Sequence, residues 1–283
     1  MGMLIGHSRP VVSSWSLHWT STSAASFVTS ATALTDDSVS SATRITWANN
    51  QAGTGFNLDI RAIIATSDIR ICGLMGLTLP VGTRIDITAF DFDFTPYTAS
   101  QRVMLLPDNS RAAWFVFPAD VIGCGRIDII IYNDVLGSGL TSPITFDIGE
   151  AWFSPAFEVA IKPSVVLKSM NTATVRRSTN GQPFPLLRRS YRTLSVDTIP
   201  VTYASAYSDP NSLAMIRGTV DYAATCVCIP TYIDQTTRLL SNAVATEQAL
   251  FGWCSNLGQI TRMPDGHYYT LSLGFDEYPP STI

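Results

Sequence analysis

The sequence predicts a mainly β protein, with an N-terminal jelly-roll β-sandwich and a smaller, β-rich (α+β) C-terminal domain. Three observations support this prediction. Short apolar or alternating runs, separated by turn residues about every ten positions, extend from about residue 15 to residue 157. A basic stretch rich in Pro, Gly, Ser and Asn then interrupts the pattern, and new strand-like runs follow it. With 283 residues and a hydrophobic fraction of 46%, the chain can bury two cores.

The jelly-roll domain is expected to occupy residues 1–160. Its strand candidates, in chain order, are SATRITWA, FNLDIRAII, DIRICGLMGLTL, RIDITAFDF, RAAWFVFP, GCGRIDIIIYND and PITFDIGEAWF. In RIDITAFDF the alternation of apolar and polar residues changes parity after Ala89, which predicts a β-bulge near that residue. Many short strands with regular turn signals are typical of a sandwich or jelly roll.

Residues 161–190 are expected to form a basic joint or arm that contains Pro and Gly. The segment STNGQPFP cannot be regular helix or central strand. A net charge of −4 argues against nucleic-acid binding. Arginine is suited to bidentate pairs across protein interfaces, so we expect a subunit interface. Its candidate residues are Arg176, Arg177, Arg188, Arg189 and Arg192.

Residues 191–283 are expected to form a ring-forming β-rich domain with one helix. The strand candidates are RTLSVDTIPV, TCVCIPTYI, ALFGWCS and HYYTLSLGFDEY. The helix is expected in SDPNSLAMIRGTVDYA, with Ser208 or Asp209 as the N-cap and Pro210 in the first turn. The segment TTRLLSNAVATEQ fits either a helix or an exposed loop.

No catalytic motif is present, so we expect no enzyme activity. The sequence contains no G-x-S-x-G motif, and its histidines, His7, His18 and His267, are scattered. Cys226 and Cys228 would share one face of a strand, where two buried, reduced thiols are favoured over metal ligands. We therefore expect neither a metal site nor a cofactor.

Carbohydrate binding is a sharper hypothesis for the jelly roll, because sugars stack on exposed aromatic rings. Trp114 and Trp152 lie in apolar strands and are expected in the core. Trp47 stands next to a polar loop, where Asn49 and Asn50 could bind hydroxyl groups. These three residues are the carbohydrate-binding candidates, and core packing of Trp47 is the competing interpretation.

Four stretches resemble the tail-tip (distal tail or baseplate) proteins of long-tailed bacteriophages. RITWANNQAGTGFNLDI, DIRICGLMGLTLPVGTRIDITAF and FDIGEAWFSPAFE are similar to that family's galactose-binding-like jelly roll. RRSYRTLSVDTIP, ALFGWCSNL and HYYTLSLGFDEY are similar to its second domain. The chain departs from the family at Gly76-Leu77-Thr78, where the family often has Gly-His-Asn, and at Ser154, where Gly is common.

The resemblance implies a structural subunit of a phage tail tip, made in the bacterial cytoplasm and carried in the virion. Its expected partners are the tail tube, the hub, the tape measure and further copies in a homo-oligomeric ring, with host-surface glycan contact through the jelly roll. A charged fraction of only 14% fits extensive protein contacts. No apolar run is long enough to span a membrane. The alternatives are a carbohydrate-binding receptor-recognition protein and a viral capsid or decoration jelly roll.

Overall fold

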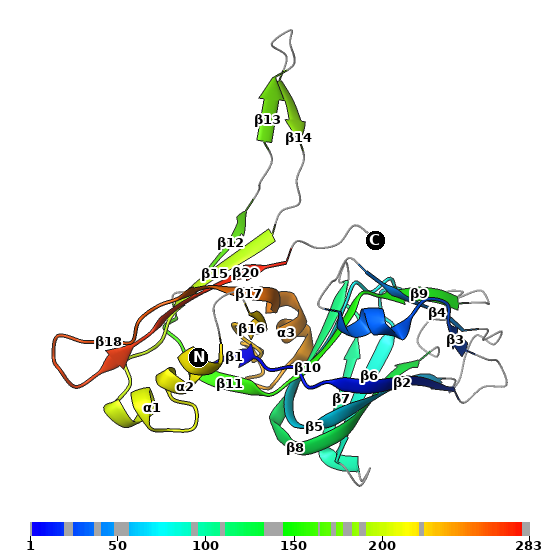
Figure 1. Cartoon of the computed structure of the whole chain (residues 1–283), viewed down its shortest axis with the longest axis horizontal. Helices are drawn as coiled ribbons and strands as arrows, with labels where there is room; N and C mark the ends of the chain where they lie inside the picture. Colours follow the sequence, from blue (N-terminus) through cyan, green and yellow to red (C-terminus); the bar gives the residue numbers. More distant parts are fainter. Residues whose placement is uncertain are drawn as a thin grey trace. The chain divides into compact units, whose positions relative to one another are not determined.

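The computed structural model of the chain is mainly β, with several antiparallel sheets and short helices (Figure 1), which confirms the predicted fold class. The structure describes residues 2–19, 25–36, 41–47, 57–91, 96–107, 111–132, 144–163, 165–170, 174–177, 183–186, 191–220 and 224–278.

The chain folds into two compact units. The sandwich unit contains Gly6–Ala156 and Thr231–Ala249, and the sheet unit contains Met1–Ile5, Phe157–Pro230 and Leu250–Thr282. The first break lies close to the expected boundary at residue 160. Neither unit is one continuous segment, however, because the start of the chain joins the sheet unit and a late segment joins the sandwich unit. A linear division into 1–160 and 191–283 therefore does not describe the units.

The sandwich unit contains two antiparallel sheets. Among the described residues, one sheet has the strand order β10-β5-β8-β6-β7 with β2 paired to β5, and the other has the order β3-β4-β9. The bounds are β2 Val12–Trp19, β3 Ala25–Phe27, η1 Ala31–Thr35, β4 Thr43–Trp47, β5 Asn57–Met75, β6 Arg84–Asp91, β7 Pro96–Leu105, β8 Ala112–Tyr132, β9 Ile144–Ile148, β10 Glu150–Ser154 and α3 Asn242–Gln248.

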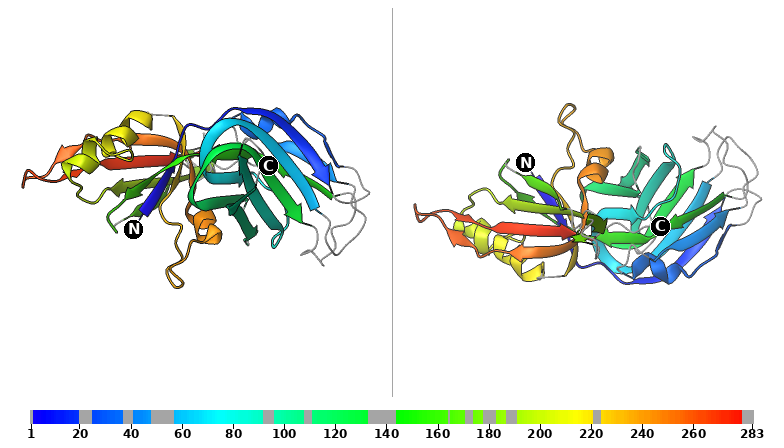
Figure 2. Two further views of the ribbon diagram at one scale, coloured as in Figure 1. Left: turned by 90° about the horizontal axis from the view of Figure 1, so that it is seen from below. Right: turned by 90° about the horizontal axis from the view of Figure 1, so that it is seen from above.

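Strands β5 and β8 are longer than the sequence patterns predicted. Most of FNLDIRAII and of DIRICGLMGLTL form one 19-residue strand, and most of RAAWFVFP and of GCGRIDIIIYND form one 21-residue strand. Register shifts between Ile63 and Ile71 bend β5 without ending it, and its curvature is visible in Figure 2. The β6–β7 register shifts between Thr88 and Phe90, near the bulge predicted at Ala89, but the extra residues lie on β7, and β6 pairs with β8 without interruption through Ala89.

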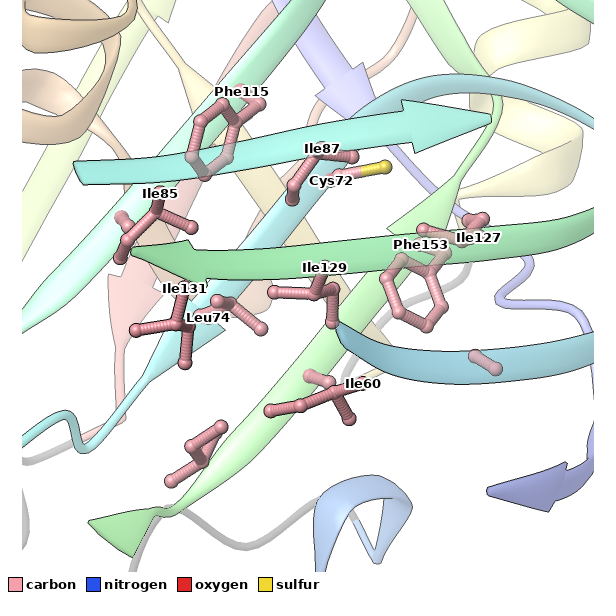
Figure 3. Close-up of a cluster of buried hydrophobic side chains, with 14 of the residues drawn as sticks. Ile60, Cys72, Leu74, Ile85, Ile87, Phe115, Ile127, Ile129, Ile131 and Phe153 are labelled. Carbon is pink, nitrogen blue, oxygen red and sulfur yellow. The ribbon is translucent and has the colours of Figure 1, made fainter. Parts of the chain in front are cut away.

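The core of the sandwich unit consists of apolar residues that alternate along these strands. Each fully buried Ile or Phe side chain contributes about 1.5–3 kcal/mol to the free energy of folding. Trp114 and Trp152 are buried, as predicted. The core residues labelled in Figure 3 are Ile60, Cys72, Leu74, Ile85, Ile87, Phe115, Ile127, Ile129, Ile131 and Phe153.

Helix α3 belongs to the sandwich unit and resolves the ambiguity of TTRLLSNAVATEQ. The backbone N–H of Trp114 donates to Thr246 Oγ1 at 2.8 Å, and that of Val116 donates to Asn242 Oδ1 at 3.1 Å. The helix therefore supplies acceptors to backbone groups of β8, which would otherwise be buried without partners. Its own N-cap is Ser241, whose hydroxyl accepts from Val244 N.

The sheet unit contains one large antiparallel sheet, described in the order β11-β1-β16-β17-β20-β15-β12. Two shorter pairs, β13-β14 and β18-β19, complete its described strands. The bounds are β1 Gly2–Gly6, β11 Ala156–Ala160, β12 Val166–Met170, β13 Thr174–Arg177, β14 Pro183–Leu186, β15 Tyr191–Asp197, α1 Tyr203–Tyr207, α2 Leu213–Thr219, β16 Thr225–Ile229, β17 Leu250–Leu257, β18 Thr261–Arg262, β19 Tyr269–Thr270 and β20 Ser272–Glu277.

Helices α1 and α2 cover one face of this sheet (Figure 2), and their apolar residues join its core. The prediction of one helix in residues 191–283 is wrong, because the described part of that range contains three. Residues 209–211 turn the chain between α1 and α2, so α2 begins later than expected. Its N-cap is Ser212, whose hydroxyl accepts from Met215 N at 3.2 Å, in place of Ser208 or Asp209.

The cysteines are free and buried. Cys226 and Cys228 both lie in the core of the sheet unit, as predicted from their spacing. Burial raises the pKa of Cys226 to about 12, because an apolar environment disfavours the thiolate. These thiols are therefore protonated and unreactive at neutral pH.

Candidate functional site

The predicted carbohydrate-binding residue Trp47 is buried. Its exposure is 1%, and it packs in the sandwich core together with Ile45. A ring without solvent access cannot stack on a sugar, so this assignment is wrong. The alternation within TRITW explains this burial, because a period of two residues places Thr43, Ile45 and Trp47 on one face of the strand. Asn49 and Asn50 lie outside the described residues.

The predicted interface arginines have different positions. Arg176 and Arg177 belong to β13, whereas Arg188 and Arg189 lie outside the described residues. Arg192 is in β15, where its Nε donates to Glu277 Oε2 of the neighbouring β20 at 3.0 Å. Arg192 thus forms an ion pair within its own sheet, which the sequence interpretation did not anticipate.

The basic stretch is an arm of one sheet and does not connect two domains. It leaves the sheet at Met170 of β12 and returns at Tyr191 of β15, and these two residues face each other. Between them, β13 and β14 pair from Thr174 opposite Leu186 to Arg177 opposite Pro183. We call residues 171–190 the arm. The expectation of a joint between two domains is therefore corrected, because Phe157–Pro230 belong to one unit, and the expected bounds of 161–190 are too wide, because β12 of the sheet occupies Val166–Met170.

The charge of the arm differs from that of the whole chain. Residues 159–196 contain seven Lys or Arg residues and no Asp or Glu. Because the chain holds 18 basic and 22 acidic residues, the remainder has 11 basic residues against all 22 acidic ones. The arm is thus a basic segment in an otherwise acidic protein, and such segregation favours contact with an acidic surface.

A second candidate site lies on the large sheet of the sandwich unit, on the face opposite the core. There, charged residues alternate with the buried isoleucines of three neighbouring strands. We call this the charged face. Its residues are Asp59 and Arg61 of β5, Arg84 and Asp86 of β6, and Arg126 and Asp128 of β8.

Four of these residues form a connected ion-pair network. Arg61 lies opposite Asp128 in the β5–β8 register. Its Nε donates to Asp59 Oδ2 at 2.6 Å and lies 3.7 Å from Asp128 Oδ2. Arg126 binds Asp128 from the other side, with 2.9 Å between Nε and Oδ1. Two carboxylates and two guanidinium groups therefore alternate across the strands.

The remaining pair of the charged face adds aromatic contacts. Arg84 donates two hydrogen bonds to Asp86, at 3.0 and 2.7 Å. The guanidinium of Arg84 lies 4.2 Å from the ring centroid of Tyr132, and that of Arg126 lies 3.9 Å from the centroid of Phe90. These are cation–π distances, and they hold both guanidinium groups in place.

The carboxylates of the charged face are buried although they lie on the outer side of the sheet. Asp128 is 4% exposed and Asp59 is 9% exposed. Burial raises the pKa of Asp128 to about 6, and the charge of Asp59 adds to the rise, while Arg126 and Arg61 oppose it. Asp59 Oδ1 accepts no hydrogen bond from any described residue. A buried acceptor without a donor lowers the free energy of unfolding by about 1–3 kcal/mol.

The charged face was missed at the sequence level, although a signal was present. Arg-Ile-Asp occurs at residues 84–86 and again at 126–128, and its reverse, Asp-Ile-Arg, occurs at 59–61. Each triplet places two opposite charges on one face of a strand and an isoleucine on the other. What the triplets do not reveal is that β5, β8 and β6 are neighbours.

The part of the chain that the structure describes contains no group of three or more His, Cys, Asp or Glu residues arranged to hold a metal ion. No helix there has the length and apolar character needed to cross a membrane.

No protein-family model matches the chain, and no curated protein sequence matches it. Two solved structures show partial similarity. A mutant lectin-binding domain of Lectinolysin, in complex with Lewis b, has 12% identity and a TM-score of 0.36 over 53% of this chain and 99% of that chain. CBM32-1 from a family 31 glycoside hydrolase of Clostridium perfringens has 11% identity and a TM-score of 0.34 over 52% and 98%. Likenesses this weak carry no conclusion about a shared ligand.

Proposed function

We propose that this protein is a structural subunit that assembles with further protein subunits through its arm. The observation that carries the proposal is the two-stranded pairing of β13 with β14, neither of which pairs with another described strand. A two-stranded hairpin in water is at best marginally stable. Such a hairpin is stabilised when it docks on a neighbouring surface.

The chemistry of the arm and of its root supports the same function. The arm contains four arginines and no acidic residue, so an acidic protein surface would attract it. At its root, β12 is the outermost strand of the sheet and exposes Leu167 and Met170. An open edge with apolar side chains is a surface on which another chain can pair or pack.

The experiment removes the arm without disturbing the sheet. Because Met170 and Tyr191 face each other, an Asn-Gly turn can replace residues 171–190 and close the hairpin. We expect the wild-type protein to self-associate in light-scattering measurements and the shortened protein to be monomeric with an unchanged melting temperature. A shortened protein that still self-associates, or a wild-type protein that is monomeric at every concentration, would contradict the proposal.

The resemblance to phage tail-tip proteins supports a finer proposal, that the assembly is a closed ring at the tip of a bacteriophage tail. Its partners would then be the tail tube, the hub and the tape measure. Antibody labelling of the parent particle, viewed by electron microscopy, tests this placement. We expect label at the tail tip, whereas label on the capsid would favour the capsid or decoration role and overturn the finer proposal.

Carbohydrate recognition is a second candidate function, favoured by the charged face. Arg61 has a partly exposed side chain and could donate to the hydroxyl groups of a sugar. Strand β2 adds exposed polar groups beside it, because Ser16 lies opposite Arg61 and His18 lies opposite Asp59. The two similar structures carry names that refer to carbohydrate recognition, but the residues of the charged face are the basis of this candidate.

A glycan array tests this second candidate. The wild-type protein should bind at least one class of glycan, and His18→Ala should weaken that binding about threefold or more, since a hydrogen bond is worth about 0.5–1.5 kcal/mol. His267→Ala, which removes an exposed histidine of the sheet unit, serves as the matched control. The carbohydrate function fails if the wild-type protein binds no glycan or if the two variants lose binding equally.

A further inference from the structure

Three tyrosines form an exposed cluster on the sheet unit, here called the tyrosine cluster. Tyr203 and Tyr207 lie four residues apart in α1, with ring centroids 5.1 Å apart. Tyr269 of β19 contacts both rings edge-on, at 6.0 and 5.4 Å. Tyr203 is 62% exposed and Tyr207 is 43% exposed. Exposed aromatic groups of this size are typical of surfaces that bind a protein partner.

The tyrosine cluster is held in place by backbone contacts. Val201 N donates to Tyr269 O at 3.0 Å, and Tyr269 N donates to Val201 O at 2.9 Å. Helix α1 begins two residues after this bridge, so the rings of both elements are brought together by the fold. A preorganised aromatic surface loses little conformational entropy when a partner binds.

The polar groups beside the tyrosine cluster are suited to a basic partner. None of the three tyrosine hydroxyls is hydrogen-bonded to another described residue, so all three are available. Asp209 follows α1, and its N–H donates to Ala204 O of that helix at 3.0 Å. Asp265 lies in the turn between β18 and β19. Asp265 Oδ1 accepts from the backbone N–H groups of His267 and Tyr268, and Arg262, which lies opposite Tyr269, donates to Gly266 O. Asp209 is therefore the nearby carboxylate to which no described residue is bound.

We propose that the tyrosine cluster of one copy of this chain binds the arm of a second copy. This inference rests on the proposed assembly function and names the partner surface. Arg176 and Arg177 supply guanidinium groups, which stack on tyrosine rings. Pro183 and Pro185 supply proline rings, which pack well on aromatic surfaces.

The distribution of charge along the chain makes a second copy a suitable occupant. The arm belongs to a segment without any acidic residue, whereas the rest of the chain has twice as many acidic as basic residues. Each copy therefore carries both members of a complementary pair. The contact is heterologous, because the arm and the tyrosine cluster are different surfaces. Repeating it generates a closed ring or an open filament.

Disulfide trapping tests the contact directly. The native cysteines are buried, so a cysteine introduced on the surface is the accessible thiol. Protein carrying Arg176→Cys is mixed with protein carrying Tyr203→Cys and oxidised. A disulfide forms only when the two Cα atoms approach to about 4.4–6.8 Å. We expect mixed dimers, with far fewer when Leu239→Cys, at another exposed position, replaces Tyr203→Cys. Equal yields with both partners would overturn the inference.

A binding measurement provides the second test. The double variant Tyr203→Ala/Tyr207→Ala should raise the dissociation constant of self-association at least about 30-fold, which corresponds to about 2 kcal/mol at an interface hot spot. Tyr268→Ala removes an exposed ring that adjoins the cluster without contacting the other rings, and should change the constant by less than about threefold. Melting curves confirm that all variants are folded.

The outcomes separate this inference from the assembly function. If arm removal abolishes self-association while the double tyrosine variant associates as the wild type does, the tyrosine cluster is not the receptor and the assembly function stands. If arm removal has no effect on self-association, both fail. If both changes abolish self-association and the cysteine pair is trapped, the arm and the tyrosine cluster form the interface.

Discussion

The charged face of the sandwich unit and the arm of the sheet unit use arginine in opposite ways. On the charged face, each Arg binds a carboxylate two residues away on its own strand, at 2.6–3.0 Å. In the arm, arginines follow one another with no acidic residue in the whole surrounding segment. The first arrangement neutralises its charges within the fold. The second concentrates positive charge in one segment, and under the proposed function this contrast would separate a stabilising role of arginine from an assembly role.

The largest effect on stability is expected for Arg126→Ala. Removing this guanidinium leaves Asp128 buried with only the more distant Arg61, and breaking a buried ion pair from one side costs about 3–5 kcal/mol. Denaturant unfolding measures the change. Arg176→Ala in the arm is the matched control and should change stability by less than about 0.5 kcal/mol. Equal losses in both variants would remove the distinction between the two regions.

Substitutions in the arm should weaken self-association and leave the stability of the fold unchanged. Replacing both Arg188 and Arg189 by Ala should weaken self-association about tenfold or more, because charge-assisted contacts are lost, while the melting temperature stays unchanged. Ultracentrifugation at several salt concentrations measures this effect. The wild-type protein should lose affinity as salt rises, and the double variant should lose less. Identical salt dependence would show that these arginines make no electrostatic contact.

The raised pKa of Asp128 makes the stability of the charged face depend on pH. In the folded protein the pKa is about 6, above the ordinary value of 3.8, so the folded state holds this proton more tightly than the unfolded state. The contribution of Asp128 to stability is therefore fully present below pH 3.8 and declines as pH rises to about 6. Asp128→Asn should abolish this decline. Melting temperatures of both proteins across that window test it, and parallel curves would contradict the assigned pKa.

The smallest effect is expected for Arg192, which lies where the arm rejoins the sheet. Its ion pair with Glu277 is partly exposed, so Arg192→Ala should cost at most about 1 kcal/mol. A double-mutant cycle with Glu277→Gln measures the coupling between the two side chains. A coupling free energy above about 3 kcal/mol would place Arg192 with the arginines of the charged face rather than with those of the arm.

Alternation within a strand predicted the burial of tryptophan side chains better than the polarity of a neighbouring loop did. The parity change in RIDITAFDF lies near a register shift between β6 and β7 but does not bulge β6 itself, whereas the apolar strands around Trp114 and Trp152 correctly placed both rings in the core. Trp47 is buried, as the competing interpretation of core packing and the alternation within TRITW both indicate, so its assignment to a sugar-binding site was wrong.

The sequence by itself determined the β class, the alternation that buries one side of each strand, and the basic character of the arm. These features follow from residue periodicity and charge, which act along the chain. Only the tertiary structure decided which strands are neighbours. The charged face exists because β5, β8 and β6 adjoin. The tyrosine cluster exists because Val201 pairs with Tyr269, 68 residues away. Long-range pairing depends on burial and hydrogen bonding of the whole sheet, which no local pattern specifies.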